Sequence, residues 1–448
     1  MTAAAVGTPA GAALGWRQWA GFMSMVVGMF MAILDIQIVS ASISDIQAGL
    51  AASPDEAAWV QTSYLIAEIV MIPLSGWLSR LLSTRVLFVA SAIGFTVFSL
   101  ACASASSLEE MVVFRAAQGF IGGAMIPTVF ATSFLLFPGS RRAQISVLIG
   151  LTATLAPTIG PTLGGWLTER LSWHWLFLIN VPVGIGVAAA VWSWLDIDRP
   201  DWSLRRNFDL TGLVLMALFL GALEYVLEEG NRWDWFADET IAWCGAISVV
   251  AGVLFFWRML TRPDPLVELR AFRDLNFSAG SLYSFILGIG LYGSVYLVPL
   301  FLGRVRGYNS LQIGETMFVT GAAMFVSAPI AGALARKMDL RLMLAIGLGM
   351  FGAGIWWLSH LTVDSAFWEL FGPQALRGFA MMFVMLPVNQ VALGRLPPQA
   401  LKNASGLYNL MRNLGGAFGL ALINTVVTDR LAHHTLHLQE QVTWARDG

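Results

Sequence analysis

The chain has 448 residues, of which 57% are hydrophobic and only 12% are charged, and its mean hydropathy is +0.69. Soluble globular proteins carry about 25% charged residues, so this composition excludes a soluble fold and predicts an all-α integral membrane protein. The net charge of −2 gives no indication of a nucleic-acid partner. Phosphate-binding loop, zinc-ligand and nucleophile-elbow motifs are absent from the sequence. We therefore expect no enzyme, no metal, no cofactor and no ATP-driven pump.

Windows of about 20 apolar residues, the length that crosses a bilayer as a helix, predict thirteen spans. In chain order, the first six cover 18–42, 57–79, 84–104, 109–136, 142–168 and 173–195. The next two cover 208–228 and 239–260. The last five cover 275–303, 310–335, 340–360, 365–394 and 402–427.

The Lys and Arg residues between these spans are distributed unequally. If the N-terminus is cytoplasmic, seventeen of them fall on the cytoplasmic side and six on the opposite side. Cytoplasmic loops of membrane proteins carry such an excess of positive charge. The bias predicts a cytoplasmic N-terminal tail (1–17) and an outer tail (428–448).

Two of the predicted cytoplasmic loops repeat one pattern. "IPLSGWLSRLLSTR" (72–85) and "APIAGALARKMDLR" (328–341) both read P-x-x-G-x-L-x-R-x-x-x-x-R. We interpret them as equivalent gating loops, whose matched residues are Gly76, Arg80 and Arg85 in one copy and Gly332, Arg336 and Arg341 in the other. Internal repeats of this kind are typical of secondary transporters.

The repeat also predicts how the spans are organised. A weaker similarity relates Arg115 in the fourth span to Arg377 in the twelfth. Superposing the copies gives an N-terminal bundle of six spans (18–195), an inserted pair of spans with its loops (196–274) and a C-terminal bundle of five spans (275–427). The second bundle is one helix short.

Several motifs, taken in order, resemble the major facilitator superfamily, and within it the fourteen-span drug:proton antiporters of the EmrB/QacA type. They are "LDIQIVSASI" (34–43), "GWLSRLLSTR" (76–85), "RAAQGFIGGAMIP" (115–127), "TIGPTLGGW" (158–166) and "WHWLFLINVP" (173–182). The resemblance implies the major facilitator fold, with two pseudo-symmetric six-helix bundles and two inserted helices, in the inner (cytoplasmic) membrane of a bacterium. It extends over nearly the whole chain.

The chain departs from the family pattern in two respects. Ser79 and Ser83 stand where the second loop of the family usually carries an acidic residue and a glycine. A fourteenth span, which the family possesses, is not found after residue 427.

Charged residues inside spans are costly and are therefore functional candidates. Asp35 in the first span is a candidate proton carrier, and the resemblance supports this because the position matches the family's first-span acidic residue. Arg115 matches the family's R-x-x-x-G pattern and is expected to modulate that carboxylate. Glu68 is a candidate second proton site or a contact for cationic substrates. The alternatives are structural: a permanent ion pair, an arginine that reaches the interface, or polar helix packing.

Four further residues are weaker candidates for the substrate cavity or for a counter-charge: Arg412, Glu224, Arg377 and Gln118. Arg412 resembles an arginine found in family members. Glu224 belongs to an inserted span, away from the repeats, and is expected to face the partner helix of that pair.

The fifth span contains an unusual group of helix breakers, namely Pro157, Gly160, Pro161, Gly164 and Gly165. The glycines form a small-residue face that lets another helix approach closely, and each proline removes a backbone donor. The motif resembles the signature of antiporter subfamilies. We expect a close-packed seam between the two halves that seals the outer side, with a simple tight helix crossing as the alternative.

Together these features predict a proton-coupled exporter of hydrophobic or amphipathic small molecules that works by alternating access and draws its energy from the proton gradient. The alternatives are an importer or facilitator on the same scaffold and, less favoured, a membrane protein that does not transport. In Gram-negative bacteria, relatives of this type work with a periplasmic adaptor and an outer-membrane channel, so the resemblance implies such partners.

Overall fold

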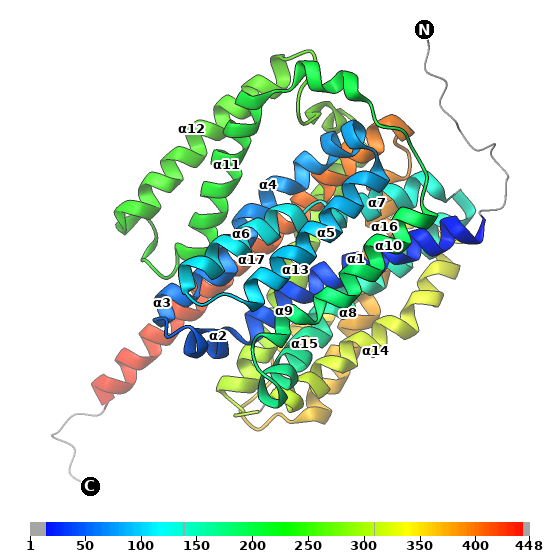
Figure 1. Ribbon diagram of the computed structural model, residues 1–448. Coiled ribbons are helices and arrows are strands. Elements are labelled where there is room, and N and C mark those ends of the chain that lie inside the picture. Colours follow the sequence, from blue (N-terminus) through cyan, green and yellow to red (C-terminus); the bar gives the residue numbers. More distant parts are fainter. Residues whose placement is uncertain (1–14, 138, 309, 442–448) are drawn as a thin grey trace.

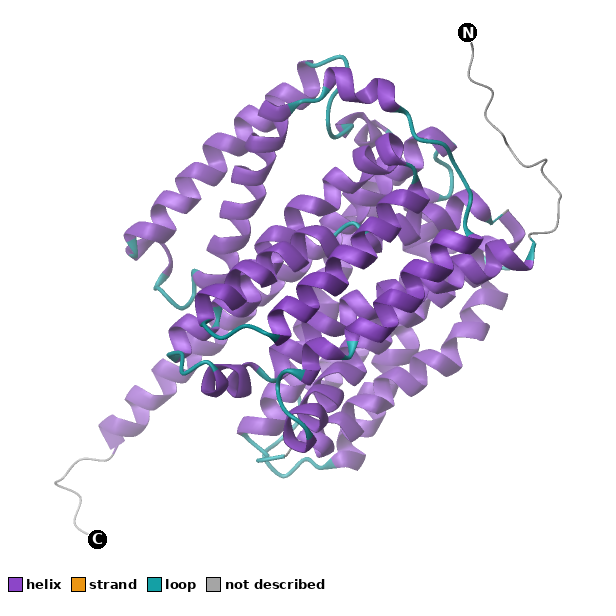
Figure 2. Ribbon diagram, viewed as in Figure 1, coloured by secondary structure: helices purple, strands orange, loops and turns teal. Residues whose placement is uncertain are grey.

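The computed structural model describes residues 15–137, 139–308 and 310–441. Within these ranges every regular element is helical, and Figure 2 shows helices joined by short loops. In this part of the chain, thirteen helical segments are long and apolar enough to cross a membrane. The predicted all-α architecture and the number of spans are therefore confirmed.

The first six spans contain the helices α1 (Trp16–Ala41), α4 (Trp59–Leu82), α5 (Thr84–Ala103), α6 (Leu108–Gly122) with α7 (Met125–Leu136), α8 (Gly139–Arg170), and α9 (Trp175–Leu178) with α10 (Asn180–Trp194). Two short helices, α2 (Ile43–Gly49) and α3 (Pro54–Ala57), connect α1 to α4. The ends agree with the predicted spans to within a few residues, because apolar windows locate the membrane-crossing part of a helix well.

The helices α4 and α6 pack almost backbone to backbone. A Cβ atom built on Gly119 of α6 would lie 2.3 Å from the carbonyl oxygen of Tyr64 in α4. Only glycine permits this separation, and such close approach is a common way to pack helices in a membrane.

The inserted pair consists of α11 (Leu210–Glu229) and α12 (Glu239–Thr261), preceded by a short 3₁₀ helix, η1 (Trp202–Asn207), and joined by another, η2 (Trp235–Ala237). Figure 1 shows the pair at one edge of the bundle, with α12 outermost. The helix α11 packs against both α4 and α17, so it contacts the two halves of the molecule.

Charged side chains fix the start of α11. Asp209 caps the helix by accepting a hydrogen bond from the N–H of Gly212, and it forms an ion pair with Arg258 of α12 at 2.8 Å. Burial raises the pKa of Asp209. The hydrogen bonds from Arg258 and Gly212, and the charge of Arg262, outweigh that effect and hold the pKa below its ordinary value.

The last five spans follow the 3₁₀ helix η3 (Leu269–Arg273) and are α13 (Leu275–Arg304), α14 (Ser310–Leu334), α15 (Leu340–Leu358), α16 (Phe367–Leu393) and α17 (Pro398–Gln441). These helices pack mainly with one another, as α1 and α4 to α10 do. The two groups meet where α8 contacts α14 and α16, and where α17 contacts α4 and α7.

The helix α17 is much longer than the predicted span, which ended at 427. It continues without a break to Gln441, and its 44 residues correspond to a length of about 66 Å. Figure 1 shows its last turns projecting beyond the neighbouring helices. Loss of hydrophobicity marks where a span leaves the bilayer, whereas a polar sequence can remain helical in water, so the predicted end is too early for the helix.

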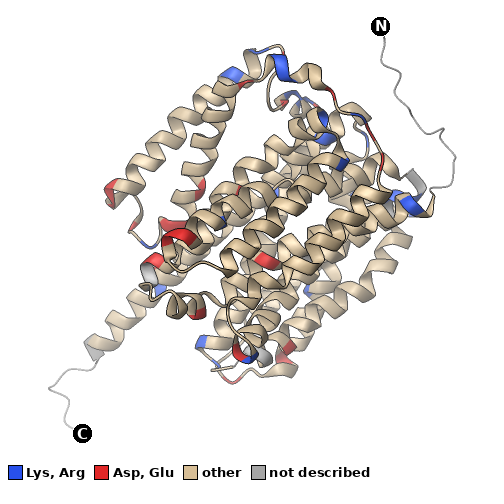
Figure 3. Cartoon of the chain, in the orientation of Figure 1, with Lys and Arg blue, Asp and Glu red and all other residues tan. Residues whose placement is uncertain are grey.

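The basic residues concentrate at one end of the bundle. Figure 3 shows many of the Lys and Arg segments around the connections between α10 and α11 and between α12 and α13. The loop between α4 and α5 lies at the same end, since the N–H of Asp201 donates to the carbonyl of Arg80. We refer to this as the arginine-rich end.

Candidate functional site

A buried ion pair forms the centre of the N-terminal half. Arg115 of α6 contacts Asp35 of α1, with 2.6 Å between Nη1 and Oδ2, and neither side chain is exposed. Two candidates from distant parts of the sequence are thus brought together. A pair of opposite charges is the arrangement in which a carboxylate tolerates a low-dielectric surrounding.

Asp35 also accepts hydrogen bonds from two amides. Asn180 of α10 donates to Oδ1 at 2.7 Å, and Gln118 donates to the same atom at 3.4 Å. Asn180 in turn donates to Ser99 of α5. Sequence reasoning did not single out Asn180; its polar side chain at the start of an apolar span, within "WHWLFLINVP", was the available signal.

Arg115 is held from several directions. It donates to the carbonyl of Val60 at 3.2 Å and to Gln118 Oε1 at 2.8 Å, and its guanidinium lies 4.3 Å from the ring centre of Tyr64. Its Nη2 has no hydrogen-bond partner among the described residues. The arginine therefore keeps the N–H groups of Nη2 unused beside the carboxylate.

Glu68 lies one turn further along α4 from Tyr64 and is 3% exposed. Its side chain makes no hydrogen bond within the described part of the chain, and it lies within electrostatic range of Arg115 and Arg412. Glu68 is therefore an unpaired carboxylate next to the Asp35 network.

Arg412 of α17 approaches the same region from the other half. It is 4% exposed, its Nη2 lies 2.5 Å from Asn409 Oδ1, and its guanidinium lies 5.2 Å from the ring of Phe130 in α7. Its Nη1 is buried without a partner in the described ranges. The structure thus brings Arg412 and Glu68 into one region between the halves.

Glu224 lies closer to this region than expected. It is 5% exposed, and its Oε2 has no partner among the described residues. Its charged neighbours are Glu228, on the next turn of α11, and Glu68 of α4. The sequence predicts that Glu224 faces α12, the partner helix of the inserted pair; its charged neighbours lie on α11 and α4 instead, because α11 also packs directly on α4.

Arg377 occupies a separate environment. It is 1% exposed, donates to Thr320 Oγ1 at 3.1 Å and forms no ion pair within the described chain. Its Nη1 lacks a partner in the same ranges.

The prediction that Arg377 corresponds to Arg115 is not supported by the packing. A Cβ on Gly378 would lie 2.2 Å from the carbonyl oxygen of Thr320, the same contact that Gly119 makes with Tyr64. Counted from these glycines, Gln374 is the equivalent of Arg115, and Arg377 is the equivalent of Gln118. The sequence comparison aligned the two arginines, whereas the backbone contact that the two halves share is made by the two glycines.

The glycines of the fifth span have a different partner from the one expected. A Cβ on Gly160 would lie 2.4 Å from Gln37 Cβ, and one on Gly164 would lie 2.8 Å from the carbonyl oxygen of Ile38. Both glycines therefore pack against α1 within the same half. Contact with the other half is made by Thr162, which lies against Gly314 of α14.

The other helix-breaking residues of α8 differ in burial. Pro157 is buried, Pro161 and Gly165 are half-buried, and the carbonyls of Gly164 and Gly165 accept hydrogen bonds from Thr168. Helix α8 thus packs through two faces. The small residues form only the face toward α1 and not, as expected, the contact between the two halves.

The two repeated loops differ in their surroundings. In the first, a Cβ on Gly76 would lie 2.7 Å from the Cα of Asn403 in α17, and Arg85 lies over the ring of Trp192. In the second, a Cβ on Gly332 would lie 3.7 Å from a side-chain carbon of Val147, and the Arg336 and Arg341 side chains are exposed.

An ion pair that the sequence did not predict joins the halves at the arginine-rich end. Lys402 of α17 contacts Asp198, which follows α10, and it also donates to the carbonyl of Ser79 at 2.9 Å. Asp198 accepts further hydrogen bonds from the N–H and hydroxyl of Thr84. A carboxylate is therefore present beside Ser79, although a different element supplies it.

Thirteen candidate spans in the described ranges, eleven of them in two packed halves and two in an inserted pair, with a buried charge network in the N-terminal half, define a multi-pass membrane protein of the transporter type. Residues 25–420 match the family model described as Major Facilitator Superfamily, and the chain belongs to this family of transporters.

The similar proteins are bacterial exporters and resistance proteins by name. The chain is 48% identical to the colistin resistance protein EmrB of Acinetobacter baumannii, over 95% of this chain and 83% of that protein. It is 32% identical to the multidrug export protein EmrB of Escherichia coli K12 (94% and 82%). It is also 32% identical to the fatty acid resistance protein FarB of Neisseria gonorrhoeae (97% and 84%).

Solved structures share the fold at low sequence identity. The proton:xylose symporter XylE aligns with a TM-score of 0.66 at 13% identity, covering 94% of this chain and 91% of XylE. The human organic anion transporter MFSD10 aligns with a TM-score of 0.58 at 16% identity, covering 91% and 93%.

Proposed function

We propose that this protein is a secondary active exporter that exchanges protons for hydrophobic or amphipathic small molecules, drugs among them. The observation that carries the proposal is the buried pair of Asp35 and Arg115, within a family of transporters. The names of the similar proteins, which include multidrug export proteins, support the class of substrate.

The pair provides a chemical switch. When Asp35 binds a proton it loses its negative charge, and the fully buried Arg115 side chain is then left without a counter-ion. A buried charge left alone is strongly unfavourable. Protonation therefore favours a rearrangement of α1 against α6 that gives Arg115 other acceptors, which is a shift between two conformations.

Glu68 and Arg412 extend this switch to the interface between the halves. In our proposal Glu68 takes a second proton or contacts a cationic substrate, Arg412 serves as its counter-charge, and Glu224 adds negative charge from α11. Gln118 positions Arg115, because it bonds both members of the central pair. Arg377 lies outside this group and acts as a counter-charge in the C-terminal half.

Transport follows from rocking of the N-terminal bundle (18–195) against the C-terminal bundle (275–427). The loops with Gly76, Arg80 and Arg85, and with Gly332, Arg336 and Arg341, gate the cytoplasmic side. We place the protein in the inner membrane of a bacterium with its N-terminus in the cytoplasm, powered by the proton gradient without a cofactor. A periplasmic adaptor and an outer-membrane channel are proposed partners.

The proposal is tested by accumulation of ethidium in cells that lack other pumps. We expect cells that produce the protein to accumulate less ethidium than cells with an empty vector, and a protonophore to abolish the difference. Unchanged accumulation for ethidium and for a broad panel of amphipathic solutes would contradict the exporter. A difference that survives the protonophore would remove the proton coupling.

A further inference from the structure

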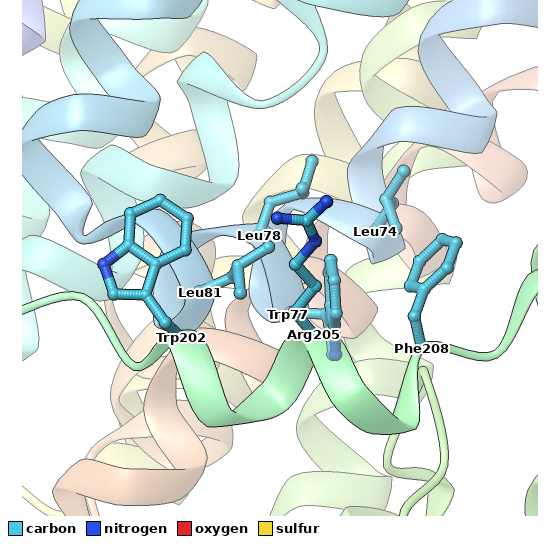
Figure 4. Close-up of a pocket in the computed structure, with 7 residues that line it drawn as sticks. All are labelled: Leu74, Trp77, Leu78, Leu81, Trp202, Arg205 and Phe208. Atoms are coloured by element: carbon cyan, nitrogen blue, oxygen red, sulfur yellow. The ribbon is translucent and has the colours of Figure 1, made fainter.

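An open apolar groove of about 420 Å³ lies between the last two turns of α4 and the helix η1, at the arginine-rich end. Its lining residues are Leu74, Trp77, Leu78 and Leu81 from α4, and Trp202, Arg205 and Phe208 from η1 and the residue after it. Figure 4 shows the Arg205 side chain rising from η1 toward α4 between the two aromatic side chains of the linker. The groove is separate from the charge network described above.

The linker that forms one wall of the groove is fixed at both ends. At its start, the N–H of Asp201 donates to the carbonyl of Arg80 at 3.0 Å. At its end, Arg262 donates to the carbonyl of Asn207 at 3.0 Å. The rings of Phe208 and Trp77 lie 4.9 Å apart and close the groove on one side.

The position of the groove indicates contact with the bilayer. Trp202 is 59% exposed and Phe208 is 38% exposed, next to the ends of three spans. Aromatic side chains at such ends are typical of the membrane–water interface, and short amphipathic helices lie in the plane of that interface. The wall formed by α4 consists of three leucines and a tryptophan, which suits a hydrocarbon chain.

Two exposed arginines beside the groove have no ion-pair partner among the described residues. Their side chains, those of Arg205 and Arg206, make no hydrogen bond or ion pair in the described part of the chain. Of the nearby carboxylates, Asp209 is paired with Arg258, whereas Asp201 and Asp264 are hydrogen-bonded to the neutral side chains of Ser203 and Asn207 and form no ion pair with Arg205 or Arg206 in the described ranges. An amphipathic anion therefore complements the groove in both polarity and charge.

We propose that this groove binds one anionic phospholipid from the membrane leaflet at the arginine-rich end. The lipid phosphate pairs with Arg205, and one acyl chain lies along Leu74, Leu78 and Leu81. Anionic lipids are attracted to basic residues at the membrane surface, and each such residue contributes enough free energy to change binding about fivefold.

The test uses the purified full-length protein, freed of lipid and titrated with phosphatidylglycerol or phosphatidylcholine of identical acyl chains under native mass spectrometry. We expect phosphatidylglycerol to bind more tightly. Arg205→Gln should weaken that binding about fivefold and weaken the binding of phosphatidylcholine less, because the choline cation already balances its phosphate. The matched control is Arg430→Gln, which removes an exposed arginine from the far part of α17. Equal affinities for the two lipids, or equal effects of the two substitutions, would overturn the proposal.

The location is tested separately. Phosphatidylglycerol with a photoreactive group on its acyl chain should label peptides that contain residues 74–81 or 202–208, and Leu78→Trp should fill the groove and reduce that labelling. Labelling confined to other segments would overturn the assignment. Displacement of the phospholipid by saturating ethidium would do so too, since it would assign the groove to substrate. None of these measurements depends on transport.

Discussion

The close approach of α4 and α6 leads to a prediction about two glycines in opposite halves. Gly119→Ala would place a Cβ 2.3 Å from the Tyr64 carbonyl oxygen, and Gly378→Ala would place one 2.2 Å from that of Thr320. An ordinary contact requires the backbones to separate by about 1 Å. Overpacking of this kind costs about 1–3 kcal/mol, so we expect both variants to unfold at lower temperature than the parent protein.

The chain offers a matched control for each half. Gly186 in α10 and Gly352 in α15 have no atom within 4 Å of a built Cβ. Replacing either by alanine should leave stability unchanged or raise it by about 0.4–1 kcal/mol, because alanine restricts the unfolded chain. Thermal unfolding of the purified variants in detergent measures the difference. Equal unfolding temperatures for Gly119→Ala and Gly186→Ala would refute the close approach. A lowered unfolding temperature for Gly119→Ala but not for Gly378→Ala would refute the equivalence of the two halves.

Three further predictions concern polar contacts. Asn180→Leu removes a hydrogen bond to a carboxylate, worth about 1.5–3 kcal/mol, so ethidium export should fall about tenfold or more at unchanged expression; full export would show that Asn180 is dispensable. Lys402→Asp replaces the ion pair with Asp198 by two like charges, which should separate the halves at the arginine-rich end. A cysteine placed there should then react faster with an impermeant maleimide, and adding Asp198→Lys should reverse this effect. Absence of that reversal would argue against the ion pair. Because the pKa of Asp209 is lowered by folding, its contribution to stability is present above the unfolded value of about 3.9 and is lost as the pH falls through the lower folded value. The difference in unfolding temperature between the parent and Asp209→Asn should therefore be constant from pH 8 to 5 and shrink below about pH 4, and a difference that persists there would contradict the assignment.

Much of the architecture follows directly from the sequence. The thirteen spans were predictable because hydrocarbon imposes a minimum apolar length on every crossing helix. Asp35 and Arg115 were predictable as candidates because charge inside a span is rare. That the two residues form an ion pair could not be predicted from the sequence, because it depends on how α1 and α6 are placed relative to each other in the fold.

The contacts that the sequence did not predict were missed for physical reasons. Uncharged Asn180 carries a weaker signal than a charged residue, although it contacts the central carboxylate. The spacing of Gly160 and Gly164 predicts a smooth helix face, but it does not specify which helix packs there. Lys402 in α17 and Asp198 in the connection after α10 lie far apart in the chain, so only the folded structure brings them together. The register of the repeat depends on backbone contacts of glycine, which a comparison of charged residues does not detect.

Proton-coupled exchange through Asp35 is the central claim, and purified protein in liposomes tests it most directly. A pH-sensitive dye inside the liposomes reports proton movement when ethidium is added under an imposed pH gradient. We predict substrate-dependent proton flux for the parent protein and for Asp45→Asn, which alters an exposed carboxylate of α2, and none for Asp35→Asn. Proton flux of equal size in the Asp35→Asn protein would contradict the account.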